Sequence, residues 1–315
     1  PTPRAANSTT PGAPAGDVIF SIPSRSFTTA PLSLTLTTAS PTAQIRYTTN
    51  RTEPNALSTL YTGPINLSTT TMVRARAFET TPGFAPGLVR TQSYTRLGTA
   101  AASFTSNLPV VVVDNFAGGR PDSDRTMFWT LFAPDAATAN RSSLTNLPVI
   151  ATRGRMVIRG SSSAGWPKYS MNIEAWDELG EDTPVAPLGM APEADWVLQS
   201  NYDFDRGMIR NPFMYEFSNR IGRWAPRWRF VEVFSNTNDG TLDYPGDYMG
   251  VYAIMEKPER GGDRIDVERL DSNDLAGEDV TGGYIVKVDR LDPGTSGWVT
   301  SRNSVSYTHL RAHET

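Results

Sequence analysis

Residues 18–96 consist of short stretches in which polar and apolar residues alternate, separated by turn-forming residues such as Ser40-Pro41 and Gly63-Pro64. Alternation at every second residue sends side chains to two opposite faces, which is typical of half-buried β-strands. The first hundred residues hold 22 Thr, three acidic residues and no Lys. The alternating stretches are Val18–Ser21, Leu32–Thr37, Gln44–Thr48, Ile65–Leu67, Met72–Phe78 and Leu88–Tyr94. Six short strands predict a small all-β sandwich over residues 18–96.

A second kind of sequence begins near residue 108, and all seven Trp of the chain lie in it. Asn211 and Pro212 suit the start of a helix and Gly222 suits its end, which predicts a helix over Pro212–Ile221. Strand-like runs surround it at residues 109–113, 154–159, 168–174, 196–200, 229–235, 250–255 and 283–288. Strands with an inserted helix and no regular strand–helix alternation predict an α+β domain over residues 108–304.

Composition predicts the linkers and excludes several classes of function. Residues 1–17 are mostly Pro, Ala, Ser, Thr and Gly and predict a flexible linker, and the small residues of 97–107 predict a second one. The chain has no Cys, which excludes disulfides and thiolate chemistry. No apolar run approaches the ~18 residues of a membrane span. The net charge of −4 does not indicate a nucleic-acid partner.

The two ends of the chain do not look like natural ends. It begins at Pro1, so any signal peptide would lie before the sequence given. The segment Val305–Thr315 (VSYTHLRAHET) resembles one translated frame of a sequencing-library adapter; the alternative is a polar natural tail. On the adapter hypothesis the native part contains no His, because His309 and His313 are the only ones. Ser-His-Asp triads and His metal ligands are then excluded.

The stretch Met156–Glu174 carries the clearest chemical signal. A strand leads into the small-residue turn Gly160–Gly165, and a second strand follows with Lys168, one of only three Lys in the chain. Backbone N–H groups of such a turn and a Lys ammonium both bind phosphate. Kinase-like nucleotide lobes place a Lys on the strand after such a loop. The alternative interpretation is a hairpin with a solvated Lys.

Kinase-like lobes also need an acid that orients this Lys. Glu216 on the predicted helix is one candidate, and the alternative for it is an ion pair with Arg220 four residues later. Glu256, at the end of an apolar strand, is the other. Asp203 and Asp205 suggest metal ligands, but a turn leading into the helix explains them better.

The first domain resembles the chitobiase/β-hexosaminidase C-terminal domain, an immunoglobulin-like module of exported bacterial proteins. The matching stretches are Ala43–Asn50, Tyr61–Ile65 and Thr71–Phe78. The resemblance implies a spacer or attachment role, with cell-wall polysaccharide as a possible partner. The aromatic side chains Tyr47, Tyr61 and Phe78 would then form a sugar platform, or they are core residues. No paired acids for glycoside hydrolysis are present in this domain.

The second domain resembles the CotH (spore coat protein H-like) kinase family over residues 108–290. Nine ordered blocks carry the resemblance: Ile158–Ser163, Pro167–Glu174, Asp195–Asn201, Met208–Asn211, Tyr215–Gly222, Pro226–Val233, Gly250–Glu256, Asp263–Ile265 and Gly282–Asp289. It implies an atypical protein kinase-like fold that transfers phosphate from ATP, with Mg²⁺, to Ser or Thr of secreted or coat proteins. By position, Lys168 becomes the phosphate-contacting Lys, and Glu216 or Glu256 its orienting acid. The nucleotide-side residues become Arg159, Gly160, Ser161, Ser162 and Ser163.

The chain departs from the family in one respect. The family's Asn-x-Asp and Trp-Asp-x-Asp segments, which position the acceptor and hold Mg²⁺, do not occur between Leu291 and Ser304. We therefore expect an inactive fragment, containing a partial kinase-like domain, whose catalytic residues and metal ligands lie beyond the chain. The parent would act as an exported kinase, extracellular or at the cell surface. The alternative is a non-enzymatic surface or coat protein, structural or carbohydrate-binding, that uses a kinase-like fold.

Overall fold

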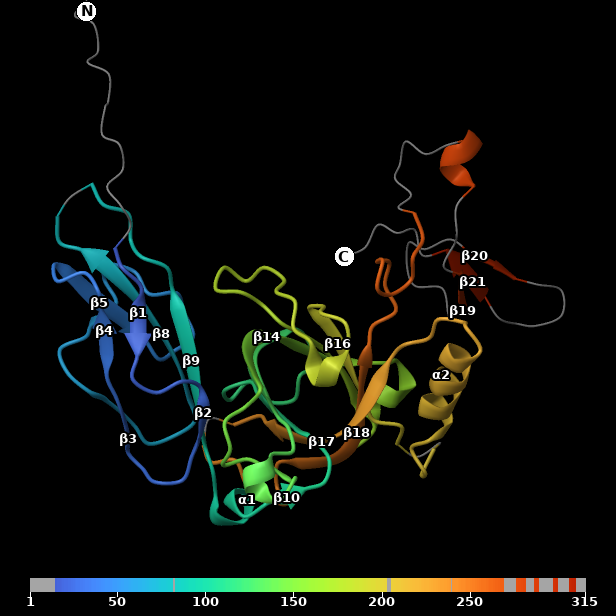
Figure 1. Ribbon diagram of the computed structural model, residues 1–315, viewed down its shortest axis with the longest axis horizontal. Coiled ribbons are helices and arrows are strands. Elements are labelled where there is room, and N and C mark those ends of the chain that lie inside the picture. The colour runs from blue at the N-terminus through green and yellow to red at the C-terminus, as the bar shows by residue number, and fades with distance from the viewer. Residues whose placement is uncertain are drawn as a thin grey trace, which may run out of the picture. The chain divides into compact units, whose positions relative to one another are not determined.

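The computed structural model describes residues 15–81, 83–202, 205–238, 240–268, 276–281, 286–288, 297–299 and 306–309. The chain divides into two compact units. The first comprises Pro1–Pro212 and Trp228–Glu256, and the second comprises Phe213–Arg227 and Lys257–Thr315. The first unit holds two bodies of strands, the blue-to-cyan body built from β1 to β9 and the green-to-orange body built from β11 to β18 (Figure 1).

The N-terminal body is the predicted β-sandwich. Its main sheet has the order β2-β9-β8-β5-β6, and the pairs β1-β4 and β3-β7 form two small sheets. The side chains of Leu34, Val73 and Tyr94 are fully buried in its core. The strands are β1 (Val18–Phe20), β2 (Arg25–Phe27), β3 (Leu32–Leu34), β4 (Leu36–Thr38), β5 (Ala43–Thr48), β6 (Thr59–Leu60), β7 (Ile65–Leu67), β8 (Thr71–Glu79) and β9 (Arg90–Arg96).

The second body is a closed barrel with the strand order β11-β12-β14-β15-β16-β18-β17. All neighbours are antiparallel except β11 and β17, which run parallel and close the barrel. The strands are β11 (Val110–Asp114), β12 (Arg125–Phe132), β14 (Ile150–Arg159), β15 (Ser170–Glu174), β16 (Asp195–Gln199), β17 (Trp228–Asn236) and β18 (Tyr248–Glu256).

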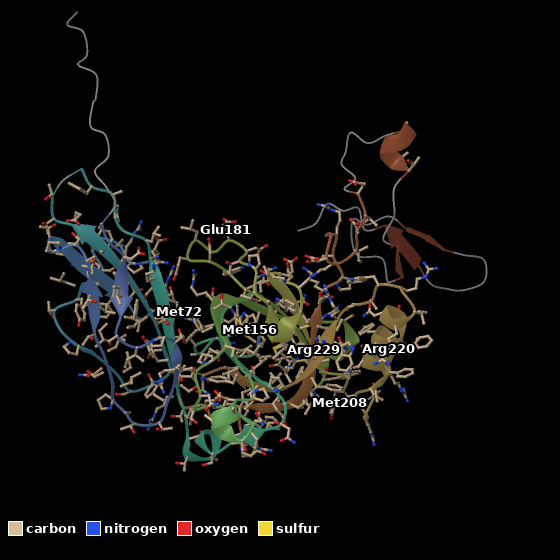
Figure 2. All side chains as sticks on the ribbon, in the orientation of Figure 1. Met72, Met156, Glu181, Met208, Arg220 and Arg229 are labelled. Atoms are coloured by element: carbon tan, nitrogen blue, oxygen red, sulfur yellow. The ribbon has the colours of Figure 1, made fainter. Side chains whose placement is uncertain are left out.

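Alternate residues of each strand fill the inside of this barrel. Trp129, Trp196 and Met156 are fully buried in its core, and Figure 2 shows Met156 among the barrel strands. Side chains fill the interior of small barrels in this way, so the interior is a packed core. Chemistry that needs access to solvent therefore does not take place inside the barrel.

The segment 97–107, predicted as a linker, carries regular structure. It contains α1 (Thr99–Ala102) and β10 (Thr105–Ser106), and β10 pairs with β13 (Ser142–Ser143). Leu97 and Ala101 are buried and pack with Val110 and Val112 from the outer face of β11. Small residues here serve close packing.

The remaining elements are few. They are α2 (Arg210–Arg220), the 3₁₀ helices η1 (Ala136–Thr138), η2 (Ser162–Gly165), η3 (Pro187–Gly189) and η4 (Gly277–Val280), and a sheet of order β19-β21-β20 with strands β19 (Val286–Val288), β20 (Gly297–Val299) and β21 (Ser306–His309). The described part of the chain is therefore mostly β. The immunoglobulin-like and kinase-like α+β assignments stay predictions. No helix in the described ranges is long and apolar enough to cross a membrane.

Within the first unit, the sandwich and the barrel share a buried interface. Met72 of β8 packs with Phe116 and Phe128 of the barrel region. The Thr95 hydroxyl donates to Oδ2 of Asp114 at 2.9 Å. The carboxyl group of Asp114 is thus enclosed at the interface, where burial raises its pKa to about 8. The Thr95 hydrogen bond opposes this rise, and the carboxylate of Asp247 adds to it.

The buried carboxyl makes stability depend on pH, and Asp114→Asn tests this. The folded chain holds a proton that the unfolded chain releases near pH 4, so the free energy of unfolding falls as pH rises from 4 towards 8. We expect the wild type to lose on the order of 1 kcal/mol per pH unit relative to Asp114→Asn in this window. Urea unfolding at pH 5 and pH 8 measures the difference. Parallel pH profiles for the two proteins would show that Asp114 is ionised in the fold.

Candidate functional site

Four connections meet at one end of the barrel, which we call the Lys168 mouth. Within the described residues they are the connections 115–124, 160–169 and 237–247 without 239, together with residues 200–202 and 205–209, which begin the connection from β16 to β17. Antiparallel pairing brings the end of β14, the start of β15, the end of β16 and the start of β18 to this end. The ends of β11 and β17 join them because these two strands are parallel and β17 is antiparallel to β18. Closure of the barrel therefore gathers segments far apart in the sequence.

The segment after β14 has the predicted strand–turn–strand order. However, β15 begins at Ser170, so Lys168 lies in the connection before this strand and not on it as predicted. Gly160 adopts φ +102°, a left-handed conformation that side chains rarely adopt, and a Cβ there would overlap the hydroxyl of Ser163. The helix η2 follows, and the N–H of Trp166 donates to the carbonyl of Ser163 at 3.2 Å. Arg159 is the last residue of β14 and lies opposite Ser170 in the ladder. The structure thus brings Arg159, the Gly160–Ser163 turn and Lys168 to one mouth.

Lys168 is half-buried against strand β18. Its Nζ donates to the carbonyl oxygen of Val251 at 2.6 Å and lies 3.8 Å from the sulfur of Met208. The same nitrogen lies 4.8 Å from the ring centroid of Tyr252. Burial lowers the pKa of Lys168, and the more distant carboxylate of Glu232 opposes this shift. An ammonium has three N–H donors. The Val251 carbonyl and the weakly accepting Met208 sulfur take two of them, and the third can donate to a ligand oxygen.

A β-bulge shapes the wall that Lys168 contacts. The register between β17 and β18 shifts between Val233 and Phe234, which leaves Met249 without a partner in the ladder. Gly250 at this bulge has φ +91°, and a Cβ there would lie 3.4 Å from Nζ of Lys168. The glycine therefore serves both the backbone conformation and the space for the ammonium.

Arg120 is a site residue that the sequence did not reveal. Its guanidinium carbon lies 4.3 Å from the ring centroid of Tyr169, the neighbour of Lys168. It donates to the carbonyl of Ala164 inside the Gly160–Gly165 turn, and its Nε donates to Asp122 at 2.9 Å. Arg120 and Ala164 are 44 positions apart, so no local sequence pattern indicates the contact.

The structure does not bring Glu256 to Lys168. Glu256 is fully buried at the far end of β18, opposite Trp196. It lies five residues beyond Val251, and at ~3.3 Å per strand residue this places the two backbones about 16 Å apart. Glu216 belongs to the second unit, where it pairs with Nε of Arg220 at 2.7 Å on an exposed face of α2. This is the pairing at i+4 that the sequence left open.

The remaining candidates are the two acids before α2 and the aromatic side chains of the sandwich. Oδ2 of Asp205 accepts from the backbone N–H of Arg210 at 2.7 Å, so Asp205 caps the start of α2, while Asp203 lies outside the described residues. No group of three or more His, Asp or Glu side chains able to hold a metal occurs in the described residues. In the sandwich, Tyr47 and Tyr61 pack against the core, and Phe78 lies beside Arg76, whose guanidinium carbon is 5.9 Å from its ring centroid.

A comparison with known protein families covers the part of the chain that forms this mouth. A family model described as CotH kinase protein matches residues 156–313, just over half of the chain. The chain belongs to the CotH kinase protein family. The CotH match begins inside β14, so β11 and β12 of the barrel precede it. It also extends over residues 305–313, and the adapter hypothesis for this segment stays a prediction.

The sandwich has its own match. The model described as chitobiase/beta-hexosaminidase C-terminal domain matches residues 23–83, in the order that the sequence resemblance predicts. A search of curated proteins gives no match.

Replacing Gly250 by Ala should disturb the wall beside Lys168. Left-handed backbone costs a residue with a Cβ about 1–2 kcal/mol, so Gly250→Ala should lower the free energy of unfolding by this amount. The added Cβ should also displace the Lys168 ammonium from the wall of β18, and the displaced amine should be acetylated faster. Gly63→Ala is the control, because Gly63 has open space around it. Urea unfolding and mass spectrometry of the acetylated chain measure both effects. Equal behaviour of the two variants would contradict the assigned role of the bulge.

Proposed function

We propose that the CotH region of this chain is the nucleotide-binding part of a phosphotransferase. It would move the γ-phosphoryl group of ATP to Ser or Thr hydroxyls of secreted or coat proteins. The observation that carries the proposal is the position of Lys168 beside the Gly160–Gly165 turn at one mouth of the barrel, in a chain of the CotH kinase family.

The chemistry of this mouth suits a polyphosphate. The turn offers backbone N–H groups, and Lys168 offers a positive charge in a setting where burial lowers its pKa. Negative phosphate oxygens would reverse that shift, and this favourable interaction would contribute to binding. A phosphate oxygen can accept from the remaining donor of Lys168, or the ammonium can exchange the Val251 carbonyl for phosphate. The guanidinium of Arg120 holds the turn from its other side.

Kinase chemistry also uses Mg²⁺, and the described residues do not form a site for it. Mg²⁺ prefers several oxygen ligands around one point, whereas the described part of the chain has no cluster of three acidic or His side chains. We therefore assign no step to a metal. The residues of the Lys168 mouth bind and orient phosphate, and that is the part of the reaction that we assign to them.

The two domain families also bear on location and partners. Both the CotH family and the chitobiase-like domain suggest an extracellular or surface protein. We propose that the acceptor is a secreted or coat protein and that the sandwich attaches the chain to its surroundings, with cell-wall polysaccharide as the candidate ligand.

Calorimetric titration of ATP into the 315-residue chain tests the proposal. Loss of a charged hydrogen bond costs about 1.5–3 kcal/mol, so Lys168→Met should weaken ATP binding by roughly tenfold or more. Lys257→Met is the matched control, because Lys257 pairs with Glu259 at 2.6 Å in the second unit. Equal weakening by the two variants would remove Lys168 from the site. Absence of ATP binding by the wild type would favour the non-enzymatic surface or coat role.

A further inference from the structure

A strained turn joins the sandwich to the Lys168 mouth. After β11 the chain passes through Phe116 at φ 51°, Ala117 at φ 63° and Gly119 at φ 68°. Consecutive non-glycine residues in the left-handed region persist only where the surroundings fix them, and such strain concentrates at functional sites. The Asn115 side chain closes the turn: Oδ1 accepts from the N–H of Gly118 at 3.1 Å, and Nδ2 donates to the carbonyl of Gly119 at 2.6 Å.

The sandwich supplies the outer support of this turn. Nη1 of Arg51, in the loop between β5 and β6, donates to the carbonyls of Asn115 at 3.2 Å and Phe116 at 3.1 Å. Phe116 is buried and packs in one cluster with Met72 of the sandwich and Phe128 of the barrel. One exposed arginine and one buried aromatic ring thus fix the strained backbone from the sandwich side.

The loop that carries Arg51 is itself held in place. Nη1 of the buried Arg74 donates to the carbonyl of Arg51 at 3.4 Å. Nη2 of the same guanidinium donates to the carbonyl of Glu178 at 2.9 Å and lies 3.5 Å from the Glu178 carboxylate. Arg74 therefore ties the Arg51 loop to the β15–β16 connection of the barrel.

The other side of the strained turn leads directly to the candidate site. Arg120 follows Gly119, and its guanidinium lies over Tyr169 and donates to the carbonyl of Ala164. Ala164 belongs to the turn that offers backbone donors to phosphate, and Tyr169 adjoins Lys168. In addition, the N–H of Ile158 in β14 donates to the carbonyl of Pro121 at 2.8 Å. A continuous series of contacts therefore runs from Arg51 to the Gly160–Gly165 turn.

We propose that Arg51 is a positioning residue of the Lys168 mouth, and that the sandwich thereby sets the conformation of the phosphate-binding turn. The inference rests on the proposed function for its nucleotide ligand, but its structural part stands on the contacts alone. The sandwich is then a component of the site in addition to any attachment role. Removing the sandwich, or substituting Arg51, should therefore change the conformation of the site. Neither change alters a residue that contacts phosphate in the proposal.

Hydrogen–deuterium exchange on the full chain without nucleotide tests the structural part. Arg51 is exposed, so Arg51→Ala should leave both cores folded and raise exchange of the amides of residues 160–169 by about 2- to 30-fold. Arg46→Ala is the matched control. Nη1 of Arg46 donates to the carbonyl of Ser58 at 3.1 Å, a contact within the sandwich. Unchanged exchange at 160–169 in Arg51→Ala, or an equal change in Arg46→Ala, would overturn the inference.

A second comparison separates positioning from general destabilisation. If Arg51 acts through the turn and Arg120, Arg120→Ala should raise the same exchange, and adding Arg51→Ala to it should produce no further change. If the two substitutions raised amide exchange additively in the double variant, Arg51 would not act through Arg120. ATP titration of Arg51→Ala, with an expected weakening of about 2- to 30-fold, tests the nucleotide part. Absence of ATP binding by the wild type would reject the proposed function, while the exchange result would still decide the role of Arg51.

Discussion

The parallel pairing of β11 with β17 is the constraint on which the rest of the structure depends. These strands lie more than a hundred residues apart in the chain, and their ladder, which runs from Val110–Glu232 to Asp114–Asn236, closes the barrel. Closure removes free sheet edges and fixes which connections meet at each end. The interior is filled by Trp129 and Trp196, so a site on the barrel lies outside it, and the Lys168 mouth is the candidate that closure assembles.

The interface between sandwich and barrel concentrates polar groups that usually lie in solvent. Arg74 is buried there beside Glu178, Arg153 lies 3.8 Å from the same carboxylate, and Asp114 is enclosed under Thr95. Burying such groups costs free energy unless they find partners. Arg74 and Oδ2 of Asp114 find theirs across this interface, so it is specific in geometry. A specific interface suits a sandwich that positions a neighbouring site, whereas a simple spacer needs only a flexible joint.

Local alternation predicted most strands of the sandwich, but not β2 and β6, and it predicted the pair β14 and β15 with Lys168 two residues too far into the strand. Strand β12 was missed, since Met127 to Phe132 are buried on both faces and no alternation remains. The helix α1 was hidden by the small residues that let it pack closely. Contacts such as Lys168 with Val251, 83 positions apart, and Arg120 with Tyr169 depend on barrel closure, which no local pattern encodes. Glu256, one of the two candidates for the acid that orients Lys168, pairs with Trp196 at the end of β18 that lies away from Lys168.

Acetylation of the three lysines, followed by mass spectrometry with and without ATP, tests the central claim most directly. Lys168 adjoins the proposed phosphate site, whereas Lys257 pairs with Glu259 in the second unit. The account predicts that saturating ATP slows acetylation of Lys168 severalfold and leaves Lys257 unchanged. Equal acetylation of Lys168 with and without ATP would contradict a nucleotide site at this mouth.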